Sequence, residues 1–436
     1  MNGRRAVICL LPQCAYLSET TRMLEIHRAL RQRGVPVRVA THGGPHESLL
    51  RAAGVGYDVI GPPMTARRSA EFVRSAVGMG NVGQSMYSDA EIHAYVAAEA
   101  EYFRAHGITV AVTGFLLTTM LSSRLAGVTV LTDHGSWVPP VYEQGLVPAP
   151  SQPPWPILRA LPERAVRWLA NAVLPRTRFY CAGFNRVAAE LGVEPVPSLP
   201  ALVLGDLAMV TEVPEILGVP ATEMAAWRPA GRRGYRAGTR LRYTGPIYAR
   251  LDLPLPDAVS AFLDRPGPVV YAAITSTSPH IIRSVVGALA TLDVRVLVAA
   301  TVHDLADLSD ERVMVAGILP SHRVMPRVDL AITAGGQGRV QTAMAAGTPV
   351  LGIPLQPEQD LNVVLLERQG AARLVSRRDA HTSRLASVAD AMLRTDRHRA
   401  AADRVRRLYD AVDGPGNAAD VIVEVAATSA RAGSTR

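Results

Sequence analysis

The sequence predicts an α/β protein with two domains, each built on a parallel sheet that helices cover on both faces. Three observations lead to this class. The chain has 436 residues, which is more than one hydrophobic core usually supports. Hydrophobic residues make up 48% of it and charged residues 19%, as in globular proteins with large cores. Short apolar segments alternate with amphipathic ones in both halves, and strands that alternate with helices form parallel sheets.

The N-terminal half is predicted to begin with a buried strand at 6–11 and a helix at 19–33, in which apolar residues recur at helical spacing. Gly34 is expected to end that helix. A Pro-rich break at 139–156 precedes an amphipathic segment at 158–174. For that segment, packing on its own domain is favoured over a membrane or acceptor-pocket role. The other strands expected in this half are 35–40, 57–60, 108–112 and 128–131.

The C-terminal half repeats the same alternation. An Arg-rich, Gly-containing segment at 231–242 is interpreted as a linker between an N-terminal domain, 1–230, and a C-terminal domain, 243–436. The last helix is expected to pack back on the N-terminal domain. The strands expected here are 269–274, 294–300, 313–316, 330–333 and 350–353. Ligands of open α/β sheets bind beyond the carboxyl ends of the strands, so the loops that follow strands are the places to look for function.

Composition excludes several classes of protein. The 46 basic residues are all Arg and exceed the 38 acidic ones by 8, which is attributed to a GC-rich genome rather than to attraction of anionic ligands. The three cysteines, Cys9, Cys14 and Cys181, have no metal-ligand spacing, which indicates a reducing cytoplasm. The longest uncharged stretch, 107–123, is rich in Thr, Ser and Gly and predicts no membrane span. No zinc, Walker, serine-hydrolase or nucleic-acid motif is found.

The most informative segment follows the strand at 330–333. It runs directly into Gly335, Gly336 and Gly338, and a helix is expected to begin at Gln337 or Arg339. Glycines allow a ligand to approach the backbone, and the amides at a helix start favour an anion such as a diphosphate. The next strand ends in a loop that carries three polar side chains, Glu358, Gln359 and Asn362.

These motifs resemble those of the family 1 nucleotide-sugar glycosyltransferases of the GT-B fold, including bacterial natural-product glycosyltransferases. That family has a His-Gly-Gly-x-Gly-Thr turn, a Gly-x-Pro strand and an Asp-Gln-x-x-Asn loop. This chain has Ala-Gly-Gly-Gln-Gly-Arg at 334–339, Gly-Thr-Pro at 347–349 and Glu-Gln-Asp-Leu-Asn at 358–362. The loops at 275–277 and 318–326 resemble the family's phosphate and nucleobase loops.

The resemblance implies two tandem Rossmann-like domains with an interdomain cleft. It also implies a nucleoside diphosphate sugar as co-substrate, UDP- or dTDP-linked, with no cofactor and no metal ion. Glu358 and Gln359 would face the sugar, although solvent-exposed loop residues are the alternative. The donor-binding residues would be Ser276, Thr277, Leu319, Gly335, Gly336, Gln337, Gly338, Arg339, Glu358, Gln359 and Asn362. The acceptor-binding residues would be Met86, Tyr87, Phe115 and Trp137.

The chain departs from the family at the reacting groups. Ala334 stands in place of the diphosphate-binding His, and Arg339 is interpreted as its substitute or as an ordinary surface arginine. Glu19 stands where the catalytic His is expected, either as a general base or as an acid that favours the helix dipole behind an N-cap at Ser18. The family's Asp has no clear counterpart after the strand at 108–112. His134 is the reserve base, that is, the second candidate for the general base if Glu19 does not have this role.

The sequence therefore predicts a cytoplasmic, hexosyl-transferring glycosyltransferase that inverts the anomeric carbon of its donor. Its partners would be a nucleotide sugar and a small acceptor, either a natural product or a nucleoside-like compound. No nucleic acid or integral membrane segment is expected, and a homodimer is left open. The alternatives are an atypical sugar-nucleotide enzyme, through hydrolysis or epimerisation, and a catalytically silent GT-B binding partner.

Overall fold

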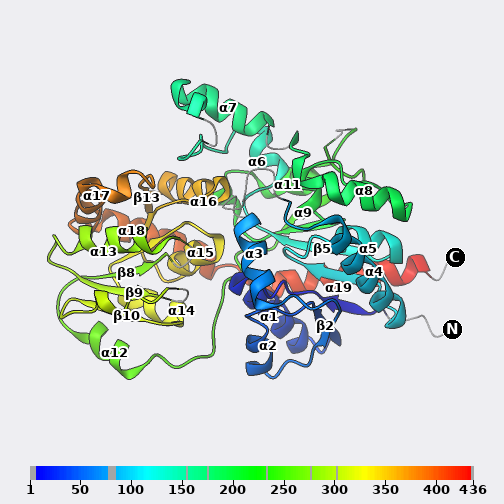
Figure 1. Cartoon of the computed structure of the whole chain (residues 1–436), viewed down its shortest axis with the longest axis horizontal. Helices are drawn as coiled ribbons and strands as arrows, with labels where there is room; N and C mark the ends of the chain where they lie inside the picture. The colour runs from blue at the N-terminus through cyan, green and yellow to red at the C-terminus, as the bar shows by residue number, and fades with distance from the viewer. Residues whose placement is uncertain are drawn as a thin grey trace. The chain divides into compact units, whose positions relative to one another are not determined.

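The structure, a computed structural model, describes residues 6–76, 85–153, 156–173, 176–231, 234–274, 277–300 and 303–433. It divides into two compact units, each with its own parallel sheet, which confirms the predicted α/β architecture (Figure 1). Unit 1 comprises Met1–Leu146, Asn171–Ile247 and Asp413–Arg436, and unit 2 comprises Val147–Ala170 and Tyr248–Val412.

The sheet of unit 1 has the strand order β3-β2-β1-β4-β5-β6-β7, and every neighbouring pair is parallel. Chain order reverses between β1 and β4, which is therefore the switch point of this sheet. The strands are β1 (Ile8–Leu10), β2 (Val37–Thr41), β3 (Asp58–Val59), β4 (Val110–Thr113), β5 (Thr129–His134), β6 (Leu207–Val210) and β7 (Arg240–Tyr243).

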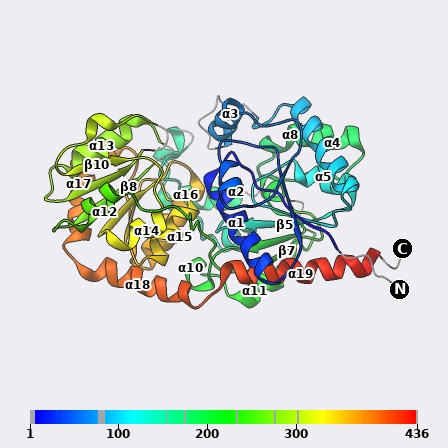
Figure 2. The same cartoon turned by 90° about the horizontal axis from the view of Figure 1, so that it is seen from below.

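Helices of unit 1 come from distant parts of the chain, and α1 lies beside the last helix, α19 (Figure 2). Leu10, Ile26, Val112 and Ile422 belong to one buried cluster, so α19 completes the core of this unit. The helices are α1 (Leu17–Gln32), α2 (Ser48–Ala52), α3 (Ala66–Ala76), α4 (Asp89–Ala105), α5 (Thr119–Ala126), α6 (Pro139–Glu143), α8 (Ala182–Leu191), α9 (Leu199–Val203), α10 (Pro214–Leu217), α11 (Ala221–Ala226) and α19 (Gly414–Gly433).

The sheet of unit 2 has the order β10-β9-β8-β11-β12-β13, again with parallel pairs, and its switch point lies between β8 and β11. Its strands are β8 (Val269–Ala273), β9 (Arg295–Ala299), β10 (Val313–Ala316), β11 (Leu330–Thr333), β12 (Val350–Gly352) and β13 (Ala372–Leu374). Its helices are α12 (Asp257–Asp264), α13 (Pro279–Leu289), α14 (Ser321–Val324), α15 (Gln337–Ala345), α16 (Pro357–Arg368), α17 (Ser383–Leu393) and α18 (Asp396–Asp410), and α7 (Glu163–Val173) runs from unit 2 into unit 1.

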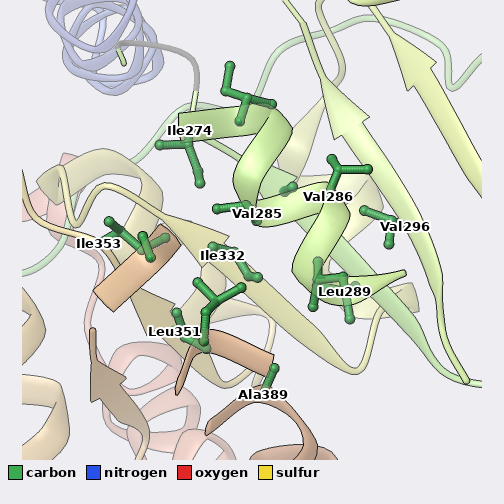
Figure 3. Close-up of a cluster of buried hydrophobic side chains, with 14 of the residues drawn as sticks. Ile274, Val285, Val286, Leu289, Val296, Ile332, Leu351, Ile353 and Ala389 are labelled. Carbon is green, nitrogen blue, oxygen red and sulfur yellow. The ribbon is translucent and has the colours of Figure 1, made fainter. Parts of the chain in front are cut away.

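A continuous apolar cluster forms the core on one face of this second sheet. Val285 and Leu289 of α13 pack with Ile332 and Leu351 of the central strands, and α17 adds Ala389 (Figure 3). All five side chains are fully buried. The strands that carry the glycine turn and the polar loop are therefore fixed by the core beneath them.

The structure differs from the predicted domain boundaries in two places. The segment interpreted as a linker, 231–242, ends in β7. Along the chain, unit 1 gives way to unit 2 between Ile247 and Tyr248. β7 escaped prediction because it is an edge strand in which Leu241 is buried between two arginines. Residues Val147–Ala170 belong to unit 2, where the amide of Ser151 donates to Asp360 Oδ2 at 3.2 Å.

The amphipathic segment forms α7 after a short 3-10 turn. Val166 and Ala170 are buried, while Trp168 is 68% exposed. Packing on the protein thus involves only one side of this helix. Among the described residues, no helix is both long and apolar enough to cross a membrane.

A fully buried carboxylate ties α4 to its neighbours in unit 1. Glu99 accepts hydrogen bonds from Thr118, from Thr119 at 3.1 Å and from Ser122 at 2.5 Å, and His42 Nε2 lies 3.0 Å from its Oε1. Each oxygen of Glu99 therefore has two partners. A buried charge with this many donors is well compensated, and removing it leaves the donors without an acceptor.

We expect Glu99→Ala to lower the free energy of unfolding by about 3–5 kcal/mol, because it breaks a buried and fully bonded pair. Urea unfolding of the full chain measures this change. Glu101→Ala, on the exposed side of the same helix, is the matched control and should change it by less than about 0.5 kcal/mol. Equal effects from both variants would contradict a structural role for the Glu99 cluster.

Candidate active site

The switch point of unit 1 brings together residues from three segments, two of which carry an acidic side chain. β1 leads into α1, whose first turn carries Glu19, and β4 is followed directly by Gly114. Asp133 and His134 are the last two residues of β5. Because β1, β4 and β5 are parallel neighbours, their carboxyl ends meet at one edge of the sheet. Residues more than a hundred positions apart are thereby brought together.

Arg22 joins two carboxylates at this edge. Its Nη2 donates to Glu19 Oε1, and its Nε lies 2.6 Å from Asp133 Oδ2. All three side chains are buried, with relative exposures of 7% for Glu19, 7% for Arg22 and 2% for Asp133. The site therefore holds one positive and two potentially negative groups away from water.

Burial raises the pKa of Glu19 to about 7; Arg22 opposes this rise and the charge of Asp133 adds to it. Burial also raises the pKa of the Asp133 carboxyl. A carboxylate whose pKa lies near neutrality can take up a proton and release it at physiological pH. A raised pKa of this kind favours the interpretation of Glu19 as a general base.

The alternative interpretation of Glu19 assigned the helix N-cap to Ser18. The N-cap of α1 is Tyr16, which makes no side-chain capping bond, and Ser18 already lies inside the helix. Glu19 is still in the first turn, where an acid favours the dipole. Its carboxylate nevertheless accepts from Arg22, and no N-cap at Ser18 lies before it.

His134, the reserve base, is held by its own loop. Its Nε2 lies 2.9 Å from the carbonyl oxygen of Trp137, and burial lowers its pKa to about 4. The ring is therefore neutral at physiological pH, and Nε2 donates to that carbonyl. A group with this pKa accepts a proton less readily than Glu19.

The four predicted acceptor residues fall into two groups. Phe115 and Trp137 are half-buried and follow β4 and β5 at the edge that carries Glu19. The ring of Phe115 stands edge-on to Tyr16, with 5.7 Å between centroids. Met86 and Tyr87 are buried, and Tyr87 belongs to an aromatic cluster in the core of the unit. Phe72 joins this cluster to Phe115, with 6.1 Å between their ring centroids. Of the four, Phe115 and Trp137 are the two that follow the strands ending at the acidic site.

The glycine turn of unit 2 is built as the sequence predicts. α15 begins at Gln337, and Gly336 is its N-cap without a side-chain capping bond. Gly335 has φ +85°, and Asn362 Nδ2 donates to its carbonyl oxygen at 3.0 Å. The same Nδ2 lies 2.6 Å from Glu358 Oε1. Asn362 thus links the turn after β11 to the start of α16, the helix that follows β12. Glu358, Gln359 and Asn362, which were predicted to lie in a loop, are residues of this helix.

Arg339 projects from the first turn of α15 towards the loop at 318–326. Its Nη1 lies 3.4 Å from Ser321 Oγ, which in turn is 3.1 Å from the hydroxyl of Tyr271. A guanidinium at a helix start is well placed to add a positive charge to the amides of that start.

The other residues predicted to bind the sugar donor differ in their burial. Leu319 is buried, whereas its neighbour Ile318 is 53% exposed. Thr277 is buried, and its carbonyl oxygen lies 2.8 Å from His303 Nε2. Ser276 lies outside the described residues.

The two residues expected to face the sugar also differ from each other. Gln359 is buried, and its Oε1 accepts from the amide of Leu355 at 2.8 Å, so it holds the loop. Glu358 is half-buried and has Asn362 and Gln356 beside its two oxygens. Glu358 is thus the more accessible of the pair.

Sequence reasoning missed Arg22 and Asp133. Arg22 is three residues after Glu19, the spacing at which side chains of one helix meet, and this was the available signal. Asp133 was sought after β4, but it comes from the neighbouring strand β5. Only strand pairing, which local sequence does not contain, brings it to Glu19.

Comparison with known proteins gives the class that the sequence motifs predict, the glycosyltransferases. Residues 300–413 match the Glycosyltransferase family 28 C-terminal domain. A PGL/p-HBAD biosynthesis glycosyltransferase of Mycobacterium tuberculosis is 26% identical over 332 residues, or 75% of this chain and 73% of that protein. The structure of the glycosyltransferase VinC in complex with DTDP has TM-score 0.65 and 15% identity, covering 97% of this chain and 100% of that one. The spinosyn rhamnosyltransferase SpnG, complexed with spinosyn aglycone, has TM-score 0.61 and 17% identity, covering 96% and 99%.

The chain is thus a glycosyltransferase with the GT-B fold, as its sequence motifs predict. Its fold is similar to that of VinC and of SpnG.

Gly335 offers a test of the glycine turn. A Cβ there would lie 2.7 Å from Val363 Cγ2 and 2.8 Å from the carbonyl oxygen of Gln359, at a φ that disfavours side chains. Gly335→Ala should therefore lower the free energy of unfolding by more than about 1 kcal/mol. Gly336→Ala has open space and ordinary φ, so it should cost less, and thermal or urea unfolding compares the two. Equal stability would mean that the turn tolerates a side chain.

Proposed function

We propose that this glycosyltransferase moves a sugar from a UDP- or dTDP-linked donor to a ring-bearing acceptor, with Glu19 as general base and inversion at the anomeric carbon. The observation that carries the proposal is the buried Glu19 carboxylate at the switch point of unit 1, with a pKa of about 7. The sequence resemblance implies that neither a cofactor nor a metal ion is needed.

The proposed reaction is a single displacement. The acceptor hydroxyl oxygen forms a bond to the anomeric carbon while the bond from that carbon to the diphosphate oxygen breaks. The electron pair of the broken bond leaves with the nucleoside diphosphate. Glu19 takes the proton of the acceptor hydroxyl as the new bond forms, which makes the attacking oxygen more nucleophilic.

On the donor side, the proposal assigns the diphosphate to the start of α15. Amides of the turn at Gly335–Gly338 favour an anion there, and the guanidinium of Arg339 adds a charge-assisted bond. Negative charge grows on the diphosphate as the sugar leaves, so donors fixed in place stabilise the transition state. The complex of VinC with DTDP supports a nucleoside diphosphate as the ligand of this fold.

On the acceptor side, the proposal assigns the aromatic rings of Phe115 and Trp137, which are half-buried and follow β4 and β5 at the edge of the sheet that carries Glu19. Such rings stack on flat or ring-bearing ligands. SpnG binds a spinosyn aglycone, which supports an acceptor of natural-product type for this chain also.

Arg339→Ala should weaken nucleoside diphosphate binding about 10- to 150-fold, the loss of one hydrogen bond to a charged group. Calorimetric titration with UDP and dTDP measures it. Arg404→Ala, which removes an exposed arginine from α18, is the control and should leave the affinity unchanged. If Arg339→Ala binds as tightly as the wild type, the amides alone hold the diphosphate.

Glu19→Gln should lower kcat about 10²- to 10⁴-fold and leave donor affinity nearly intact, because the amide keeps the size of the side chain but not its basicity. Release of nucleoside diphosphate, with and without candidate aglycones, gives kcat and separates transfer from donor hydrolysis. Glu25→Gln is the matched control: Glu25 is also 7% exposed, lies on the same helix and pairs with an arginine three residues on. Normal turnover in Glu19→Gln would remove the base role from this residue.

A further inference from the structure

The acidic site of unit 1 has two oxygens that Arg22 does not reach. Arg22 donates to Oε1 of Glu19 and to Oδ2 of Asp133. Oε2 of Glu19 and Oδ1 of Asp133 are buried and have no hydrogen-bond partner. The backbone amide of Phe115 lies near the Glu19 carboxyl and lowers its pKa, but it does not donate to Oε2. A buried acceptor without a donor is costly, and two such acceptors in one site call for a common explanation.

Both of these oxygens face Gly114. A Cβ on that residue would overlap Glu19 Oε2 and Asp133 Oδ1 together, so the two oxygens converge on the same small region. Gly114 lies outside the positive-φ region, and it is the lack of a side chain that the site uses. Two ionised carboxylates that converge in a buried site repel each other, and one proton held between them removes the repulsion.

The charge balance of the buried site also favours one proton on the pair of carboxyls. With one proton shared, the two carboxyls carry a single negative charge, and the guanidinium of Arg22 neutralises it. The buried site is then neutral overall. With no proton it carries one uncompensated negative charge, and with two it carries an uncompensated positive one, both of which burial disfavours.

We propose that Glu19 and Asp133 share one proton, and that Asp133 is a positioning residue that sets the protonation of the base. The role in catalysis rests on the proposed function of Glu19, whereas the shared proton does not. When the proton is lost, both carboxylates are ionised and Glu19 can accept the proton of the acceptor hydroxyl. That transfer restores the shared state, and the proton then leaves to solvent before the next turnover.

Other groups at the site do not supply this proton. Tyr16 lies three residues before Glu19, and burial together with the charge of Glu19 raises the pKa of its hydroxyl above its already high ordinary value. His134, next to Asp133, has its pKa lowered to about 4, so it is neutral at physiological pH. Arg22 stays charged throughout. The titration near neutrality therefore belongs to the carboxyl pair.

The two neighbours of Glu19 act on its pKa in opposite directions. The negative charge of Asp133 raises it and the positive charge of Arg22 lowers it. Asp133→Asn should therefore lower the pKa of Glu19, and Arg22→Gln should raise it, each by about 1–3 pH units. Loss of packing or of stability would not produce shifts of opposite sign.

The test is a carboxyl ¹³C NMR titration of the full chain labelled at glutamate side chains, together with the pH profile of kcat. We expect one glutamate signal that titrates near pH 7, is lost in Glu19→Gln, persists in Glu25→Gln and moves to lower pH in Asp133→Asn. The kcat profile should fall as the pH drops through the same value and should shift with the signal. Arg22→Gln should move both to higher pH, and Arg22→Lys, which keeps the charge, should restore them in part.

The inference is overturned if no glutamate titrates near neutrality, or if Asp133→Asn leaves the signal in place. If the signal behaves as expected but Glu19→Gln turns over normally, the shared proton stands and the base role fails. The NMR titration needs only folded protein, so a variant that is inactive but folded still gives an answer.

Discussion

Parallel strand pairing is the constraint on which the functional arrangement of this protein depends. In each unit the carboxyl ends of all paired strands lie at one edge, and the order of the strands reverses next to the first strand of the unit. Glu19, Gly114 and Asp133 meet for this reason, although they follow or end three different strands. The turn at Gly335 and the start of α16 at Glu358 meet in the second unit for the same reason. Strand pairing thus brings these residues together, whether they stand on a strand, a turn or a helix.

Unit 1 buries acidic side chains in two different ways. Glu99 has four donors for its two oxygens, which is a stable and rigid arrangement. Glu19 and Asp133 share a single guanidinium and are left with two unpaired oxygens. Full satisfaction of buried polar groups favours stability, and partial satisfaction leaves groups whose protonation responds to pH. The first cluster accordingly belongs to the scaffold, and the second has the character of a reactive site.

Local sequence predicted the elements that carry their own pattern. The strands at 313–316 and 330–333 were predicted to the residue, and Gln337, where α15 begins, was one of the two starts expected for that helix, because runs of buried apolar residues end there in turn-forming ones. β7 was missed because its one buried leucine stands between two arginines, so no run of apolar residues marks this edge strand. Asp133 was missed as a partner of Glu19, and 147–170 was assigned to the other unit, because both depend on contacts between distant segments. Periodicity reports which face of an element is buried but not what it is buried against.

The place of α19 has a consequence for the order in which this protein matures on the ribosome. The apolar side of that helix, with Ala418, Val421 and Ile422, belongs to the core around β1 and α1. It is nevertheless synthesised after residues 248–412, which form nearly all of unit 2. Domains generally fold as units during synthesis, the N-terminal one first. Here unit 2 has all the residues of its core before unit 1 does, so nascent unit 1 lacks the apolar side chains of α19 until the second unit has been synthesised.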